Sequence, residues 1–309
     1  MKLRTNCPYC SQLRPLEAHL HELGLVCEYL GNDAPCADID SQRTVRTKTI
    51  GDWLKLASQL DEVKVDAWRF ENDAGYCGTF ADRVSSNSTH FTLYSTALTR
   101  FLFVSSALEE TYRFVDHHYV KLADKFNIPP KVRPRTSSIR AASLVDLMPS
   151  EASPLHLQHR ADQYRLLFAR YLKDHQLEMS GLQYSDEAKL GYSLHLVRNL
   201  RNHIAHGVFP LLPNPDYDWG TDFDRDELIV LLGQSCRLAA MYMQMLLHQF
   251  NTGFMSDEYS YCEDGDGPEF DYLLEHCTVG YIASLHIKQN FSIAGAFDYA
   301  GRPWEEAEK

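Results

Sequence analysis

The sequence lacks any hydrophobic run of the length that crosses a membrane, which is about 20 residues. Its first residues, MKLRTNCPYC, also lack the apolar stretch of a secretory signal peptide. We therefore expect no membrane segment and a cytoplasmic location. In that reducing compartment the eight cysteines are expected to be free thiols, metal ligands or catalytic groups rather than a disulfide framework.

Positive charge is scarce as well. The 30 lysines and arginines face 42 aspartates and glutamates, for a net charge of −12. This balance excludes a protein that coats nucleic acid with a broad basic face. It leaves open an enzyme that holds a single phosphodiester in a local positive pocket. The cations gather at 43–48, 131–140 and 196–206 and the anions at 256–275, and solvated surface is the plain alternative for both.

The sequence does contain clear helical patterns. Its 309 residues are enough for one large domain or two smaller ones. Apolar spacing and capping signals predict helices over 92–126, 153–175, 185–207 and 224–250. Pro129 and Pro130 are predicted to end the first of them, and residues 131–150 to form a basic, serine-containing loop. The helix over 224–250 is apolar nearly all round and is predicted to be the core helix. Short strands are predicted at 278–287 and 290–297. We expect a mainly α fold: a four-helix bundle in 91–255, a small N-terminal cysteine-containing module in 1–90, and an acidic loop with a C-terminal extension in 256–309.

The helix at 185–207 carries an arginine where an apolar residue is expected. At about 100° per residue, several apolar positions fall within roughly 40° of one another and predict a core-facing stripe: Leu190, Leu194, Val197, Ile204 and Val208. Arg201 falls at about 20°, inside this stripe. Because burying an unpaired guanidinium costs several kcal/mol, we expect Arg201 to meet a carboxylate, carbonyl groups or a bound anion.

The polar residues that follow Arg201 favour chemistry on a phosphate. His206 precedes the helix-ending Gly207, where exposed carbonyl groups favour the imidazolium form. A histidine that titrates near neutrality suits proton transfer. Arg201 can clamp a phosphate and stabilise its added charge, and Asn202 can orient either group. The structural alternative is that the arginine and histidine cap carbonyls and pair with a glutamate of a neighbouring helix.

The segment RNHIAHG, residues 201–207, resembles the signature of the HEPN superfamily: arginine, a polar residue, three more residues, and histidine near the end of a bundle helix. Arg201, Asn202 and His206 match it residue by residue, and the resemblance covers about 92–252. It implies a HEPN-like four-helix bundle and a metal-independent endoribonuclease, in which the ribose 2′-hydroxyl attacks its own phosphodiester and leaves a 2′,3′-cyclic phosphate. It also implies RNA as partner, no cofactor for catalysis, and a homodimer with a composite active site.

A second match with the same spacing overlaps the first, with Arg198 and His203 in the two positions. We prefer the pair Arg201 and His206, because Arg201 lies in the predicted stripe and His206 adjoins the glycine. Arg198 and His203 are then auxiliary residues.

Two further features bear on pairing and regulation. Glu109 and Glu110, on the first long helix, are candidates to pair with the motif arginine. Val208 stands where toxins paired with a nucleotidyltransferase antitoxin often carry a tyrosine, so the resemblance implies no AMPylation switch. We expect a stand-alone or differently regulated toxin or antiphage-defence effector.

Two other functions stay open at this point. The first is a non-catalytic HEPN module that binds nucleotide or RNA as a sensor or scaffold, with the same arginine holding the anion. The second is a zinc-stabilised interaction protein in which the motif only fixes helices to one another.

The N-terminal cysteines allow two interpretations. CPYC is the tetrapeptide of glutaredoxin active sites, but only six residues precede it and no βαβ pattern follows. A structural zinc site fits better, with Cys7, Cys10, Cys27 and Cys36 as four soft ligands and His19 or His21 as substitutes. Unliganded thiols are the alternative. A zinc-stabilised module would serve to recognise RNA or a regulatory protein partner.

Overall fold

The computed structural model describes residues 7–37, 43–71, 75–179, 187–217, 225–255 and 277–293. Within them the fold is mainly helical, which confirms the predicted class. The helices are α1 Leu16–Tyr29, α2 Thr47–Gln59, α3 Gly78–Lys125, α4 Ser137–Leu147, α5 Leu157–Asp174, α6 Leu190–Ala205, α7 Arg225–Phe250 and α9 Val279–Ala283. Strands β1 Asp33–Pro35 and β2 Thr44–Arg46 pair antiparallel, with Ala34 opposite Val45. Short 3₁₀ turns lie at Cys10–Gln12, Ala67–Phe70, Pro130–Val132, Ser150–Ala152 and Thr252–Met255.

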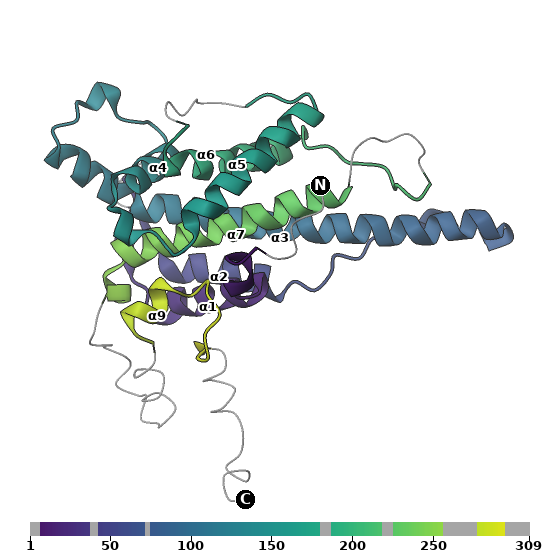
Figure 1. Ribbon diagram of the computed structural model, residues 1–309, viewed down its shortest axis with the longest axis horizontal. Coiled ribbons are helices and arrows are strands. Elements are labelled where there is room, and N and C mark those ends of the chain that lie inside the picture. The colour runs from purple at the N-terminus through teal and green to yellow at the C-terminus, as the bar shows by residue number, and fades with distance from the viewer. Residues whose placement is uncertain are drawn as a thin grey trace, which may run out of the picture.

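The helices are arranged in three layers (Figure 1). α3 and α7 pack along each other in the middle, α1 and α2 cover one face with α9 beside them, and α4, α5 and α6 cover the other. α7 is buried on nearly every side, so the predicted core helix is confirmed. Among the described helices, α7 alone is long and apolar enough to cross a membrane, and 78% of its most apolar window is buried inside the fold.

A single hydrophobic core runs through the three predicted segments. It joins Leu20 and Ile50 from residues 1–90 to Phe101 and Tyr242 from 91–255. Ile282, near the C-terminus, belongs to the same cluster. The N-terminal helices therefore complete the packing around α3 and α7.

α3 begins at Gly78, fourteen residues before the predicted start. The prediction missed these first turns because their side chains are polar. Serine and threonine hydroxyls on one face bind the backbone of the segment before it: Ser88 Oγ accepts from Ala67 N, Thr92 Oγ1 from Val65 N and Thr96 Oγ1 from Val63 N, each at 2.9–3.0 Å. The hydroxyls are four residues apart on the helix, a rise of about 6.0 Å, and the amides are two residues apart on the extended segment, a span of about 6.6 Å. The two spacings nearly match, so successive hydroxyls meet successive amides. A search for apolar spacing does not detect such a face.

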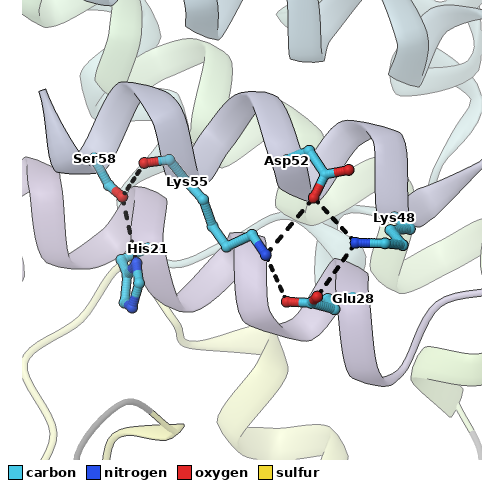
Figure 2. A network of polar contacts seen from close by, with 6 residues as sticks. All are labelled: His21, Glu28, Lys48, Asp52, Lys55 and Ser58. Carbon is cyan, nitrogen blue, oxygen red and sulfur yellow. Dashed lines mark hydrogen bonds and ion pairs between the residues drawn. The ribbon is translucent and has the colours of Figure 1, made fainter.

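Charged side chains join α1 to α2 on the outer face (Figure 2). Glu28 of α1 forms ion pairs with Lys55 Nζ at 2.7 Å and with Lys48 Nζ at 3.3 Å, and Asp52 of α2 forms ion pairs with the same two lysines. At the other end of the pair, His21 Nδ1 lies 3.3 Å from Ser58 Oγ. His21, which we had considered as a substitute zinc ligand, is therefore part of this helix–helix contact.

Two local predictions were wrong. Residues 131–150 were expected to form a basic loop, but α4 occupies 137–147. Its Ala141, Leu144 and Val145 are buried, and Arg140 makes two 3.0 Å bonds to the buried carboxylate of Asp116. Residues 278–287 were expected to form a strand, but 279–283 are helical, and only Ile287 makes an isolated bridge, to Leu13.

Several predictions fall on residues outside the described ranges. They concern the acidic loop 256–275, the helix-start residues Ser185 and Asp186, the cap at Asp224 and residues 294–297 of the predicted strand 290–297, whose described residues 290–293 form no strand. α6 itself begins at Leu190, with Lys189 as its N-cap, so the predicted helix starts too early; the described part of α7 begins at Arg225.

Candidate functional site

The end of α6 carries the motif residues, and its geometry is that of a glycine-terminated helix. Gly207 has φ +67°, a conformation that glycine adopts without steric cost. Val208 N donates to His203 O at 2.8 Å, and Gly207 N donates to Ile204 O at 3.1 Å, which is the Schellman pattern. His206 is the C-cap residue and its side chain is exposed. The predicted helix end is therefore confirmed.

The buried side of α6 is wider than the predicted stripe. Along the middle of the helix, residues on most of the circumference are buried: Gly191, Ser193, Leu194, His195, Leu196, Val197, Asn199, Leu200 and His203. In the C-terminal half of α6 the less buried residues apart from Ile204 lie at about 20–120° from Leu190 and form an open arc of Arg198, Arg201, Asn202 and Ala205; nearer the start of the helix, Gly191 and Leu194 in the same range are buried. Within the predicted core-facing stripe, Leu194 and Val197 are fully buried, and Leu190 and Ile204 pack partly buried against the core, so the stripe is confirmed up to Ile204. Arg201 is half-buried at the open side, while Val208 is 45% exposed.

Two of the buried polar residues, Ser193 and His203, have hydrogen-bond partners that offset the cost of their burial. Ser193 Oγ accepts from Arg165 Nε at 2.8 Å. His203 lies between two partners, with Nδ1 3.0 Å from the Tyr171 hydroxyl and Nε2 3.0 Å from the carbonyl of Glu178. Burial lowers the pKa of His203. The auxiliary His203 therefore holds α6 against α5 and the segment that follows it.

Arg201 has few contacts. Within the described part of the chain, the one hydrogen bond of its guanidinium goes from Nη1 to Asn202 Oδ1, at 3.5 Å. No carboxylate among the described residues pairs with it; Glu110 pairs instead with Arg113 on its own helix. The expected carboxylate partner of Arg201 is thus absent from the described residues, and the one acceptor it meets there is the side-chain carbonyl of Asn202.

Arg198 lies on the same open arc and meets α3. Its Nη1 is buried and has no hydrogen-bond partner among the described residues, and the same holds for the hydroxyl of Tyr112 on α3. Burial raises the pKa of Tyr112 well above its usual value; Glu109 adds to this effect and Arg198 opposes it. Burial, with Arg198 second, lowers the pKa of His195 to about 4. Glu109 and Arg198 therefore both lie near the Tyr112 hydroxyl. The motif gave no indication of Tyr112 or His195.

The predicted zinc ligands are split by the fold. Cys7 and Cys10 lie together, and the third group beside them is His159 of α5, with all three ligand atoms within 4.8 Å of one another. Hydrogen bonds from the backbone and side chain of Cys10 lower the pKa of the Cys7 thiol to about 6. Cys27 and Cys36 are fully buried in the hydrophobic core and are not members of this group. The four-cysteine set is therefore wrong, and the residue that the sequence did not reveal is 149 positions from Cys10.

The substitute ligand His19 is also engaged elsewhere. It is fully buried, with Nε2 3.0 Å from Gln244 Oε1 and Nδ1 2.9 Å from Arg237 Nη1. Its pKa is lowered well below the usual value, first by burial and then by Arg237.

These observations define a helical protein with an arginine-bearing open arc on α6 and a separate cysteine–histidine cluster at the start of α5. Comparison with protein-family models, with curated proteins and with solved structures finds no match.

Proposed function

We propose that this protein is a metal-independent endoribonuclease of the HEPN type, acting as a homodimer in a cytoplasmic toxin or antiphage-defence role. The observation that carries the proposal is the open arc of α6, where Arg201 and Asn202 lie next to a helix end capped by exposed His206. Arg201 has no carboxylate partner in the described chain, so its charge is available to an RNA phosphate. The net charge of −12 is compatible with a contact confined to this arc.

The proposed reaction moves one proton to and one proton from the RNA. His206 takes the proton of the ribose 2′-hydroxyl, O2′ forms a bond to phosphorus, and the bond to O5′ breaks. The imidazolium form of His206 then gives a proton to the leaving O5′, and a 2′,3′-cyclic phosphate remains. Arg201 stabilises the charge that develops on the phosphorane-like oxygens, and Asn202 positions the phosphate.

Helix geometry supports a site shared by two copies. Positions 201 and 206 are five residues apart, which is roughly 140° around a helix axis. A single helix end therefore does not direct both side chains at one phosphodiester. Two copies of α6 facing each other across a two-fold axis would combine the arginine of one chain with the histidine of the other.

The test is cleavage of single-stranded RNA by the purified full chain in EDTA, with helical content checked by circular dichroism in the same buffer. His206→Ala should lower the rate by about 10²–10⁴-fold, as for a lost general acid or base. Arg201→Ala should lower it by about 10²–10³-fold. The matched controls are His117→Ala and Arg69→Ala, which change the same residue types outside α6. Undiminished cleavage by folded His206→Ala would reject the assignment.

The same experiment separates the non-catalytic alternative. An RNA- or nucleotide-binding module would bind RNA through Arg201 and lose affinity in Arg201→Ala, but it would show no cleavage to lose in His206→Ala. Mixing Arg201→Ala with His206→Ala chains provides a further check. A composite site predicts that mixed dimers regain about one intact site, so that activity partly returns.

A further inference from the structure

Three soft or borderline metal ligands converge from two distant parts of the chain. Cys7 Sγ lies 3.6 Å from His159 Nε2, and Cys10 Sγ completes a group whose atoms all lie within 4.8 Å of one another. The two cysteines flank a tight turn, closed by Ser11 N donating to Cys7 O at 3.2 Å. His159 lies in the first turn of α5. Two independent elements thus present thiol and imidazole groups to one point.

The spacing matches tetrahedral zinc. Zn–S bonds of about 2.3 Å and Zn–N bonds of about 2.0–2.1 Å, at tetrahedral angles, put sulfur and nitrogen about 3.5 Å apart and two sulfurs about 3.8 Å apart. The 3.6 Å between Cys7 Sγ and His159 Nε2 is already at the first value. The upper limit of 4.8 Å for the group exceeds the second by about 1 Å, which rotation of an exposed cysteine side chain can close.

We infer that Cys7, Cys10 and His159 form a binding site for Zn²⁺ or a similar thiolate-preferring divalent ion. Three protein ligands leave the fourth position of a tetrahedral ion for water or an added ligand. Carboxylate-preferring ions such as Mg²⁺ are excluded by the donor set, since they require oxygen ligands.

The surroundings hold two of the ligands in place. Arg160, the neighbour of His159, donates from Nη1 to Cys10 Sγ at 3.2 Å and also contacts Gln234 of α7. Its single positive charge offsets part of the negative charge of two thiolates. The ring of Tyr9 lies 4.8 Å from the rings of both His156 and His159.

His156 is the neighbouring imidazole that the site does not use. Its Nε2 lies 3.1 Å from Gln12 Oε1, so that nitrogen is already engaged. It also has φ +67°, which fixes it at the N-cap of α5 rather than within the helix. This difference gives the experiment its matched histidine control.

An ion here would attach the N-terminal segment to α5 across 152 residues of chain. Closing a loop of that length removes much conformational freedom from the unfolded chain. Zinc binding is therefore expected to raise the melting temperature, independently of any ribonuclease activity.

The test is a titration of the reduced, metal-free full chain with Co²⁺ and then Zn²⁺. We expect one equivalent of Co²⁺ to produce a sulfur-to-cobalt charge-transfer band and the intense visible bands of tetrahedral cobalt, and Zn²⁺ to displace them. X-ray absorption of the zinc-loaded wild type should count two sulfur ligands and one imidazole. Because three ligands leave one position open, a small added thiol should shift the visible cobalt bands.

The variants separate ligands from bystanders. Cys7→Ser and His159→Ala should lose the charge-transfer band or weaken cobalt binding at least tenfold, with circular dichroism showing that each variant is folded. Cys77→Ser, an exposed cysteine elsewhere, and His156→Asn, which tolerates positive φ, should bind as the wild type does. No cobalt band in the reduced wild type, or an unchanged band in His159→Ala, would overturn the assignment. A wild-type zinc shell without two sulfurs would do so as well.

Discussion

Lowering the pH should destabilise the fold through a chain of buried hydrogen bonds that needs two neutral histidines. The chain links α1, α7 and the C-terminal segment. Arg237 Nη1 donates to His19 Nδ1 at 2.9 Å, and Nε2 of that ring faces Gln244 Oε1 at 3.0 Å. Gln244 Nε2 faces His286 Nδ1 at 3.1 Å, and His286 Nε2 donates to the carbonyl of Leu155 at 2.8 Å. Both rings accept at Nδ1, so an added proton there would face another donor.

The size of the effect follows from His286. Burial lowers its pKa from 6.5 to about 4, Arg237, Arg14 and His156 act in the same direction, and the Leu155 carbonyl opposes them. Between pH 6.5 and about pH 4, His286 therefore binds a proton in the unfolded chain but not in the folded chain. Stability from this group is complete above pH 6.5, falls as the pH drops towards 4, and falls no further below that. The difference corresponds to roughly 3 kcal/mol at one histidine.

Urea denaturation between pH 7 and pH 4 measures this loss. His286→Gln keeps a polar side chain but removes the titration, so its free energy of unfolding should fall less with pH than that of the wild type, by roughly 3 kcal/mol over the interval. His206→Asn, which changes an exposed histidine, should keep the wild-type slope. Equal pH slopes in wild type and His286→Gln would refute the reasoning, whatever their stabilities at pH 7.

Three further predictions concern charge, packing and helix propensity. Asp116→Ala leaves the half-buried Arg140 without its carboxylate and should lower the free energy of unfolding in urea by about 3–5 kcal/mol. Asp174→Ala, which removes a surface ion pair, should lower it by less than about 1 kcal/mol. Similar losses in the two variants would contradict the burial argument. Gly31→Ala would place Cβ 1.5 Å from Thr47 Oγ1 and 2.3 Å from Cys27 O and should lower the melting temperature. Gly233→Ala, in open space on α7, should add about 0.5–1 kcal/mol, and a loss there would contradict the assigned helix.

Apolar periodicity predicted the long helices because each of them buries apolar side chains in the core. The end of α3 was found from Pro129 and Pro130, and the end of α6 from Gly207, because these residues restrict or permit backbone angles locally. The first turns of α3 were missed because serine and threonine hydroxyls bind a neighbouring backbone there. That partner is set by tertiary structure, and no local pattern encodes it.

The segment at 278–287 shows the opposite error. Its valine, tyrosine and isoleucine residues favour a strand by propensity, yet Thr278 Oγ1 caps Tyr281 N at 3.2 Å and starts a helical turn. Tyr281 and Ile282 are then buried, and the Tyr281 hydroxyl donates to the buried carboxylate of Glu22 at 2.6 Å. Packing against α1 and α7 outweighs the propensity. The prediction of Cys27 and Cys36 as zinc ligands was wrong for a related reason, since sequence spacing cannot show that α5 brings His159 to Cys7.

The burial of α6 bears on which of its two overlapping arginine–histidine pairs is suited to catalysis. His203 would have to release Tyr171 and the Glu178 carbonyl before it could exchange a proton with substrate, and leaving such buried groups unsatisfied costs about 1–3 kcal/mol each. His206 is exposed at the helix end and meets no such cost. Arg198 differs from its partner in the motif, because it shares the open arc with Arg201, and its buried Nη1 has no hydrogen-bond partner among the described residues. Its guanidinium adds positive charge beside Arg201, so we expect Arg198 to strengthen RNA binding while His206 alone determines proton transfer.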